Sequence, residues 1–107
     1  MKDDRVYLQH IHDALDDIAT YASAGREAFL AERMRQDATI RKLQVIGEAV
    51  KSLSDTPKSR HAQIPRKQIA GLRDKVNFGV NLEIVWAVVE QDLPVLRRAI
   101  DQLLSEG

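Results

Sequence analysis

Residues 64–86 read IPRKQIAGLRDKVNFGVNLEIVW, and the expected organisation of the chain centres on this stretch. Pro65 suits the first turn of a helix. The apolar residues of that helix fall on one side at helical spacing: Ile69, Leu72 and Val76. Phe78-Gly79-Val80 interrupts the helix, and Asn81 can cap a following one. The stretch therefore predicts two helices joined by a glycine-containing loop.

The segment after Asn81 is apolar nearly all round, which predicts the central core helix of the fold. Its apolar residues are Leu82, Val85, Trp86, Val88 and Val89. Asp92-Leu93-Pro94 is a second helix-start signal, because proline is tolerated in the first turn of a helix but not in its interior. We expect either a kink or a new helix at Asp92, and a last helix from Leu93 to Ser105.

Two further helices are predicted on the N-terminal side. Asp3 or Asp4 can cap a first helix that ends near Gly25. A short segment, 26–33, leads into a long helix from about Gln36 to Ser54. Gly47 lies inside that helix and predicts a helix crossing or a self-association contact. With no period-2 stretch anywhere, residues 1–107 are expected to form a single all-α domain, an antiparallel bundle of four to five helices.

Composition limits the class of protein. The chain has 107 residues, 44% hydrophobic and 30% charged, which suits one core. It has no cysteine, so disulfides and thiolate zinc sites are excluded. The charged N-terminus lacks the apolar run of a signal peptide, and no apolar stretch is long enough to span a membrane. We therefore expect a cytoplasmic protein.

The formal net charge of zero conceals an uneven distribution. Residues 1–32 carry a net charge of −4, residues 33–75 carry +7, and residues 76–107 carry −3. A basic segment can present a positive face to a polyanion such as RNA, because binding to phosphates depends on local charge. Cations on a solvated helix face would give the same count, so both interpretations stay open.

The strongest candidate for a functional site in the sequence is Arg73-Asp74-Lys75 with Asn77. An arginine fork suits a pair of phosphate oxygens, and Lys75 can add a point charge. Alternatively, both cations simply stabilise a helix C-terminus. No metal-ligand spacing, phosphate-binding glycine loop or hydrolase triad accompanies them, and His10 and His12 face different ways, so no metal or cofactor is expected.

Four stretches together carry a resemblance to a known family. They are Tyr7-Leu8-Gln9-His10-Ile11, residues 37–49 (DATIRKLQVIGEA), Ile64-Pro65 with residues 69–74 (IAGLRD), and residues 80–86 (VNLEIVW). In this order they resemble the HepT-like branch of the HEPN superfamily, small helical toxins encoded beside a minimal nucleotidyltransferase antitoxin. The resemblance covers nearly the whole chain, from Asp4 to about Leu104.

This resemblance implies a metal-independent RNase that works as a homodimer. The family motif is Arg, four to six residues, His, one residue, Tyr. Its His moves a proton during attack by the ribose 2′-hydroxyl, and its Arg stabilises the charged phosphate. The antitoxin transfers AMP to the Tyr. The resemblance thus implies catalytic roles for Arg73 and Asp74, and makes Lys75 and Asn77 candidate RNA contacts.

The match fails inside the motif. Residues 74–81 read DKVNFGVN, with neither the His nor the Tyr that should precede Phe78, so the chain is about three residues short there. No remaining side chain in this segment has a pKa suited to proton transfer near neutrality. We therefore expect an inactive or poor RNase.

An engineered deletion, a naturally degenerate motif or residues missing from the sequence as written would each explain the gap, and the first and last are favoured. Two other functions stay open. The chain could be a non-catalytic helical module that binds RNA or a partner through its basic segment, or a subunit that only dimerises. The RNA target and the stoichiometry with the antitoxin do not follow from the sequence.

Overall fold

The computed structural model describes residues 4–53 and 81–105, and every element in these ranges is helical. The elements are α1 (Asp4–Ala22), α2 (Arg26–Ala31), α3 (Arg33–Ser52), α5 (Leu82–Ala87), the π-helix η1 (Val88–Asp92) and α6 (Leu93–Ser105). The expected all-α bundle is confirmed. The third predicted helix, starting near Pro65, lies outside the described residues.

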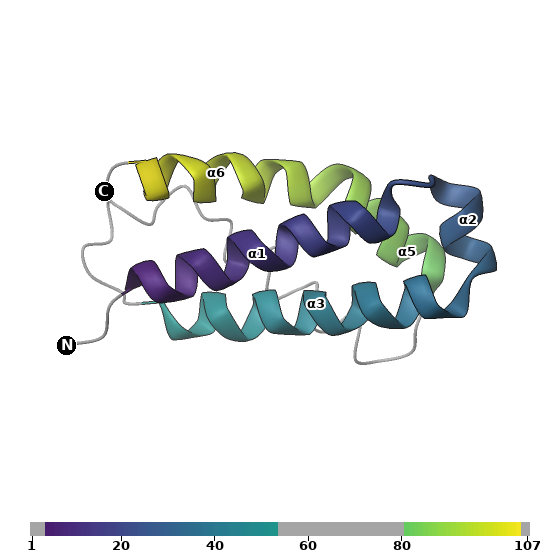
Figure 1. Ribbon diagram of the computed structural model, residues 1–107, viewed down its shortest axis with the longest axis horizontal. Helices are drawn as coiled ribbons and strands as arrows, with labels where there is room; N and C mark the ends of the chain where they lie inside the picture. Colours follow the sequence, from purple (N-terminus) through teal and green to yellow (C-terminus); the bar gives the residue numbers. More distant parts are fainter. Residues whose placement is uncertain (1–3, 54–80, 106–107) are drawn as a thin grey trace.

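The three long helices lie side by side, with α1 packed on both α3 and α6 (Figure 1). The chain runs along α1, turns through α2 and returns along α3, so α1 and α3 are antiparallel. From α5 the chain runs back along α6, which is also antiparallel to α1 (Figure 1). The short helices α2 and α5 lie together at one end of the bundle.

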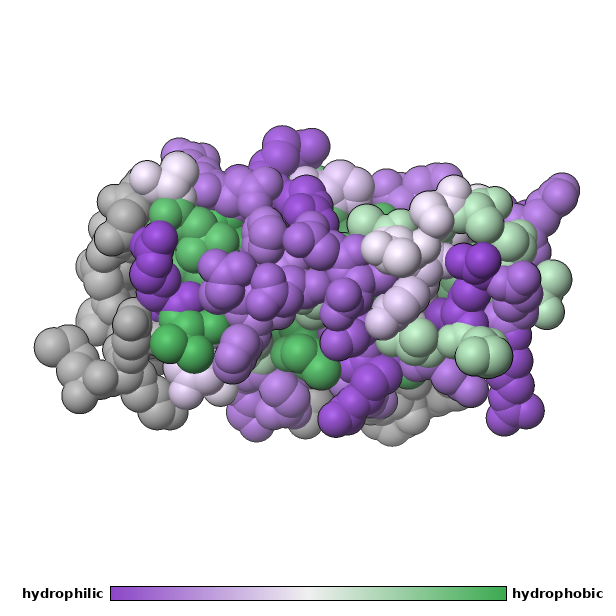
Figure 2. All heavy atoms as spheres, viewed as in Figure 1, coloured by the Kyte–Doolittle hydropathy of each residue, from purple (hydrophilic) through white to green (hydrophobic). Residues whose placement is uncertain are grey.

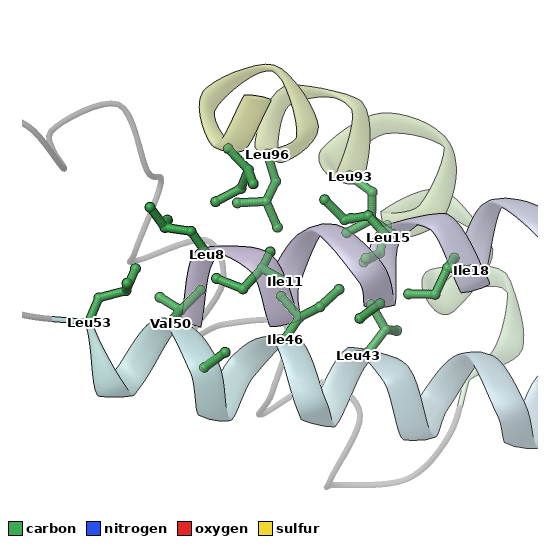
Figure 3. Packing of buried hydrophobic residues seen from close by; sticks show 14 of the residues in the cluster. Leu8, Ile11, Leu15, Ile18, Leu43, Ile46, Val50, Leu53, Leu93 and Leu96 are labelled. Carbon is green, nitrogen blue, oxygen red and sulfur yellow. The ribbon is translucent and has the colours of Figure 1, made fainter. Parts of the chain in front are cut away.

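The hydrophobic core forms around α1 rather than around the helix after Asn81. Ile11, Leu15 and Ile18 of α1 are buried between the side chains of α3 and α6 (Figure 3). Their spacing places them on one stripe of the helix. In contrast, α5 has one buried residue, Val85, and Ile84 is exposed. The expected central core helix was therefore wrong, because α5 is six residues long and lies at the bundle end.

The corner between α1 and α2 is built on Gly25. Its N–H donates a hydrogen bond to the carbonyl of Ala22, which closes α1. Its φ of 93° lies in the region that favours glycine. The carbonyl of Gly25 accepts from the N–H of Phe29 and so begins α2. The predicted helix end is confirmed, and α3 starts at Arg33, three residues earlier than expected.

The chain passes from α5 to α6 without leaving helical geometry. Leu93 N–H donates to the carbonyl of Val88, five residues back, which is the hydrogen bond of a π-helix. Pro94 has no N–H and cannot donate a backbone hydrogen bond within the helix. The wider turn of η1 before it accommodates the missing hydrogen bond. The expected last helix, Leu93 to Ser105, is confirmed as α6, and the π-helix η1 joins it to α5 without a break.

Candidate functional site

The four predicted site residues, Arg73, Asp74, Lys75 and Asn77, lie outside the described residues, and so do the neighbouring positions of the incomplete motif. The described chain stops at Leu53 and resumes at position 81. Leu53 is buried at the end of α3, and position 81 precedes α5 at the other end of the bundle (Figures 1 and 3). The predicted site thus belongs to a segment whose two flanks are placed at opposite ends of the fold.

The flank after the predicted site is fixed by a helix cap. Asn81 Oδ1 accepts hydrogen bonds from the backbone N–H groups of Glu83 (3.0 Å) and Ile84 (3.3 Å). These two bonds confirm the predicted N-cap. Arg26 Nη2 lies 3.0 Å from Glu83 Oε1 and ties the start of α5 to α2. The helix that follows the predicted motif, α5, therefore begins at a position fixed by these contacts.

Three cations of α3 form ion pairs on the surface of the bundle. Arg33 lies 3.7 Å from Asp37, and Arg35 pairs with Glu32. Lys42 lies 2.9 Å from Asp17 of α1, and this hydrogen bond raises the pKa of Lys42. Three of the five cations of α3 are therefore paired, whereas Arg41 and Lys51 make no ion pair with any described residue.

A hollow of about 320 Å³ lies between the first turns of α1 and the second half of α3. Tyr7 and His10 line it from α1, and Arg41, Gln44, Glu48 and Ser52 are its polar residues from α3. The rings of Tyr7 and His10 meet edge to face, with centroids 6.3 Å apart and planes at 87°. Aromatic pairs commonly adopt this arrangement. The hollow thus combines aromatic surface with an unpaired guanidinium.

Sequence reasoning missed this hollow, although a signal was present. Positions 41, 44, 48 and 52 are three or four apart and so share one face of α3, and Tyr7 and His10 share one face of α1. Taken alone, each of these two helix faces has the composition of an ordinary polar surface. Only the antiparallel pairing of α1 with α3 brings the two faces together.

His12 lies on a different face of α1 from His10, as predicted. Its Nδ1 is 3.6 Å from carboxylate oxygens of Asp13 and Asp16, and its Nε2 is 3.7 Å from Asp101 of α6. Within residues 4–53 and 81–105, these groups and the other His, Asp and Glu side chains form no cluster that could hold a metal ion. His12 therefore lies between carboxylates of α1 and α6.

Nothing in the described helices is long and apolar enough to cross a membrane. Figure 2 shows a mostly hydrophilic face, in which hydrophobic residues form small separate groups. Four large hydrophobic side chains of the described residues are exposed: Val6, Met34, Ile84 and Val95.

Comparison with known families assigns the class of protein. Residues 11–103 match the family described as HepT-like, ribonuclease HepT-like. Together with the helical bundle, this match defines an all-helical domain of ribonuclease type. The chain belongs to the HepT-like family, as its motifs predicted.

Related proteins support the same class. The "Putative RNase TTE0752" of Caldanaerobacter subterraneus subsp. tengcongensis is 34% identical over 110 positions, covering 99% of this chain and 98% of the relative. The "Probable ribonuclease HepT" of Thermococcus cleftensis is 35% identical, covering 91% of this chain and 92% of the relative.

A longer relative also matches. The "Gamma-glutamylcyclotransferase and putative RNase MJ0434" of Methanocaldococcus jannaschii is 36% identical, covering 98% of this chain and 49% of the relative. This chain therefore spans about half the length of that protein. No solved structure matches the chain.

Proposed function

We propose that this chain is a HepT-like RNase toxin whose catalytic motif is incomplete. The observation that carries the proposal is the family match across residues 11–103, which includes the segment with Arg73. In the complete motif, the 2′-oxygen of a ribose forms a bond to phosphorus as the bond to the next nucleotide's 5′-oxygen breaks. The His takes up the 2′-hydroxyl proton, and the leaving 5′-oxygen gains a proton. Arg73 would stabilise the charge on the phosphate, with Asp74 beside it.

The length of the alignments supports a shortened motif. The alignment with the Caldanaerobacter relative runs over 110 positions, and this chain has 107 residues, so the relative has residues where this chain has none. Between Arg73 and Asn81 the sequence has no side chain with a pKa suited to moving the proton at neutral pH. As written, the chain is then an inactive RNase.

The decisive experiment is to restore the motif. A variant with His, one residue and Tyr inserted between Val76 and Phe78 should cleave labelled RNA in the presence of EDTA and arrest growth on expression. Arg73→Ala in the same background should abolish both effects, whereas Lys51→Ala, a matched cation on the exposed surface of α3, should not. A restored protein that is folded and dimeric but cuts no RNA contradicts the RNase proposal.

The partners belong to the same proposal. The protein works as a homodimer, and a nucleotidyltransferase antitoxin of the minimal type silences the active form by transferring AMP to the motif Tyr. Co-expression with the neighbouring gene tests this pairing. The restored protein should gain the mass of one AMP on its new Tyr, and the chain as written, which lacks that Tyr, should gain none.

A second candidate function follows from the missing His and Tyr. The chain as written would be a non-catalytic helical module that binds RNA or the nucleotidyltransferase, with Lys75 and Asn77 among its contacts. Salt-sensitive RNA binding that persists after Arg73→Ala, without cleavage, would favour this function.

A further inference from the structure

The hollow between α1 and α3 has the chemical parts of a nucleotide site. Its volume is about 320 Å³. This volume lies at the lower end of the range for small-ligand sites. Tyr7 contributes a half-buried ring, and His10 meets it edge to face. The Tyr7 ring packs against the core and also lines the hollow. Aromatic rings that line a site are surfaces on which RNA bases stack.

The charges of α3 indicate where a phosphate would bind. Lys42 is next to Arg41 in sequence but points to Asp17 of α1, at 2.9 Å. Arg41 lines the hollow, is exposed, and makes no ion pair with any residue of the ranges 4–53 and 81–105. An unpaired guanidinium beside an aromatic wall suits a phosphate oxygen pair, since its planar fork can donate two hydrogen bonds.

The opposite end of the hollow has different chemistry. Gln44 and Glu48 follow Arg41 on the same face of α3 and also line the hollow. Glu48 lies two helical turns from Arg41, about 10 Å along the axis. A carboxylate repels a phosphate, and the side-chain amide of Gln44 can both accept hydrogen bonds from a base and donate them to it. The lining of the hollow thus favours a phosphate at Arg41, away from Glu48.

We propose that this hollow binds one nucleotide of a single-stranded RNA, with Arg41 contacting its phosphate and Tyr7 stacking on its base. The identity of the ligand as RNA rests on the proposed RNase function. None of the described residues that line the hollow belongs to the motif, so the role proposed for the site is to hold the strand.

Binding can be measured without cleavage. The probe is a fluorescein-labelled 2′-O-methyl oligoribonucleotide of about eight nucleotides, a length within the range bound by single-strand sites. Arg41→Gln should weaken its binding about tenfold and reduce the salt dependence by about one counterion. Lys51→Gln is the matched control, because Lys51 is an exposed, unpaired cation of α3 among the described residues and does not line the hollow. It should change the affinity less than about twofold.

The aromatic contact is tested by a pair of substitutions at one position. Tyr7→Phe keeps the ring and should bind the probe like the unmodified chain, whereas Tyr7→Leu should weaken binding about tenfold without changing the salt dependence. Circular dichroism and thermal unfolding check that each variant is folded. If Tyr7→Leu does not fold, the comparison of Arg41→Gln with Lys51→Gln decides the proposal by itself.

Three results obtained with the chain as written would overturn the proposal. They are absence of probe binding, equal weakening by Arg41→Gln and Lys51→Gln, and conversion of a dimer to a monomer by Arg41→Gln on size-exclusion chromatography. The last would mean that the hollow is a contact between copies. In the motif-restored protein, cleavage that is insensitive to Arg41→Gln at low RNA concentration refutes this site alone. Probe binding that depends on Arg41, without any cleavage, refutes the RNase activity and supports the site.

Discussion

The ring of Phe29 in α2 packs against the indole of Trp86 in α5, with ring centroids 5.3 Å apart and planes tilted by 39°. Phe29 is fully buried, although α2 is only six residues long. This contact and the ion pair of Arg26 with Glu83 attach α5 to the corner that follows α1. The chain that resumes after the predicted motif is therefore held by residues from the first third of the sequence.

Phe29→Ala should lower the free energy of unfolding by about 3–5 kcal/mol, because it removes a buried ring and leaves a cavity. The ring is fully buried, and the cavity would lie beside Trp86. Chemical denaturation measures this loss. Met34→Ala is the control, since Met34 is 85% exposed. Its substitution should change stability by less than about 0.5 kcal/mol. Similar losses for both variants would contradict the packing of α2 on α5.

Asn81→Ala should destabilise the protein by about 1 kcal/mol, as expected for the loss of an N-cap. The N–H groups of Glu83 and Ile84 lose their side-chain acceptor in this variant. Asn81→Asp keeps an acceptor oxygen and should be close to neutral. Thermal unfolding should separate the two variants, since about 1 kcal/mol corresponds to a shift of roughly 4–8 °C in a domain of this size. Equal melting temperatures would show that the cap contributes nothing.

Gly25→Ala tests the corner between α1 and α2. Gly25 has φ 93° and ψ 178°. Residues with a Cβ rarely adopt this conformation, so the substitution should cost about 1–3 kcal/mol. A Cβ at this position would meet no atom within 4 Å, so the cost comes from the backbone and not from a clash.

The control for this corner is Ala24→Ser, at the exposed preceding position. It should be neutral within about 0.5 kcal/mol. Denaturation midpoints provide the measurement, and a neutral Gly25→Ala would refute the strained corner.

The Asp13 carboxylate should titrate below 3.8, because the hydrogen bond from Gln9 Nε2, 3.0 Å long, lowers its pKa, with a smaller contribution from His12. A lowered pKa in the folded state adds stability above the unfolded value, and this contribution is lost as the pH falls through the folded value. Carbon NMR of the side-chain carboxyl measures the titration. Gln9→Ala should move the Asp13 pKa upward, and Gln102→Ala, on exposed α6 surface, should leave it unchanged.

Several features of the fold followed from local sequence. Hydrophobic spacing predicted the helices that became α1, α3 and α6, because a helical stripe must be buried against another element. Gly25 and Asn81 were identified as helix boundaries because capping depends on neighbouring residues only. The family was identified from ordered motifs on four segments, and the match across residues 11–103 confirms it.

Other features depended on which helices meet. The helix after Asn81 has the most continuous apolar run, yet α1 is central because it packs on both α3 and α6. Asp92-Leu93-Pro94 was compatible with a break or a kink, and the π-turn at Leu93 decided for a continuous helix. Periodicity shows that a face is apolar, but it does not show how many neighbours cover that face.

The sequence by itself determined the helical class, the family and the absence of His and Tyr between Arg73 and Asn81, since these follow from residue order alone. The tertiary structure decided which cations of the described residues are paired. Lys42 and Arg41 are adjacent and equally basic in the sequence, but the packing of α3 on α1 pairs Lys42 with Asp17 and leaves Arg41 in the hollow with Tyr7. Charge in a sequence becomes a binding surface only where the fold does not neutralise it, because an ion pair within the protein already satisfies both groups.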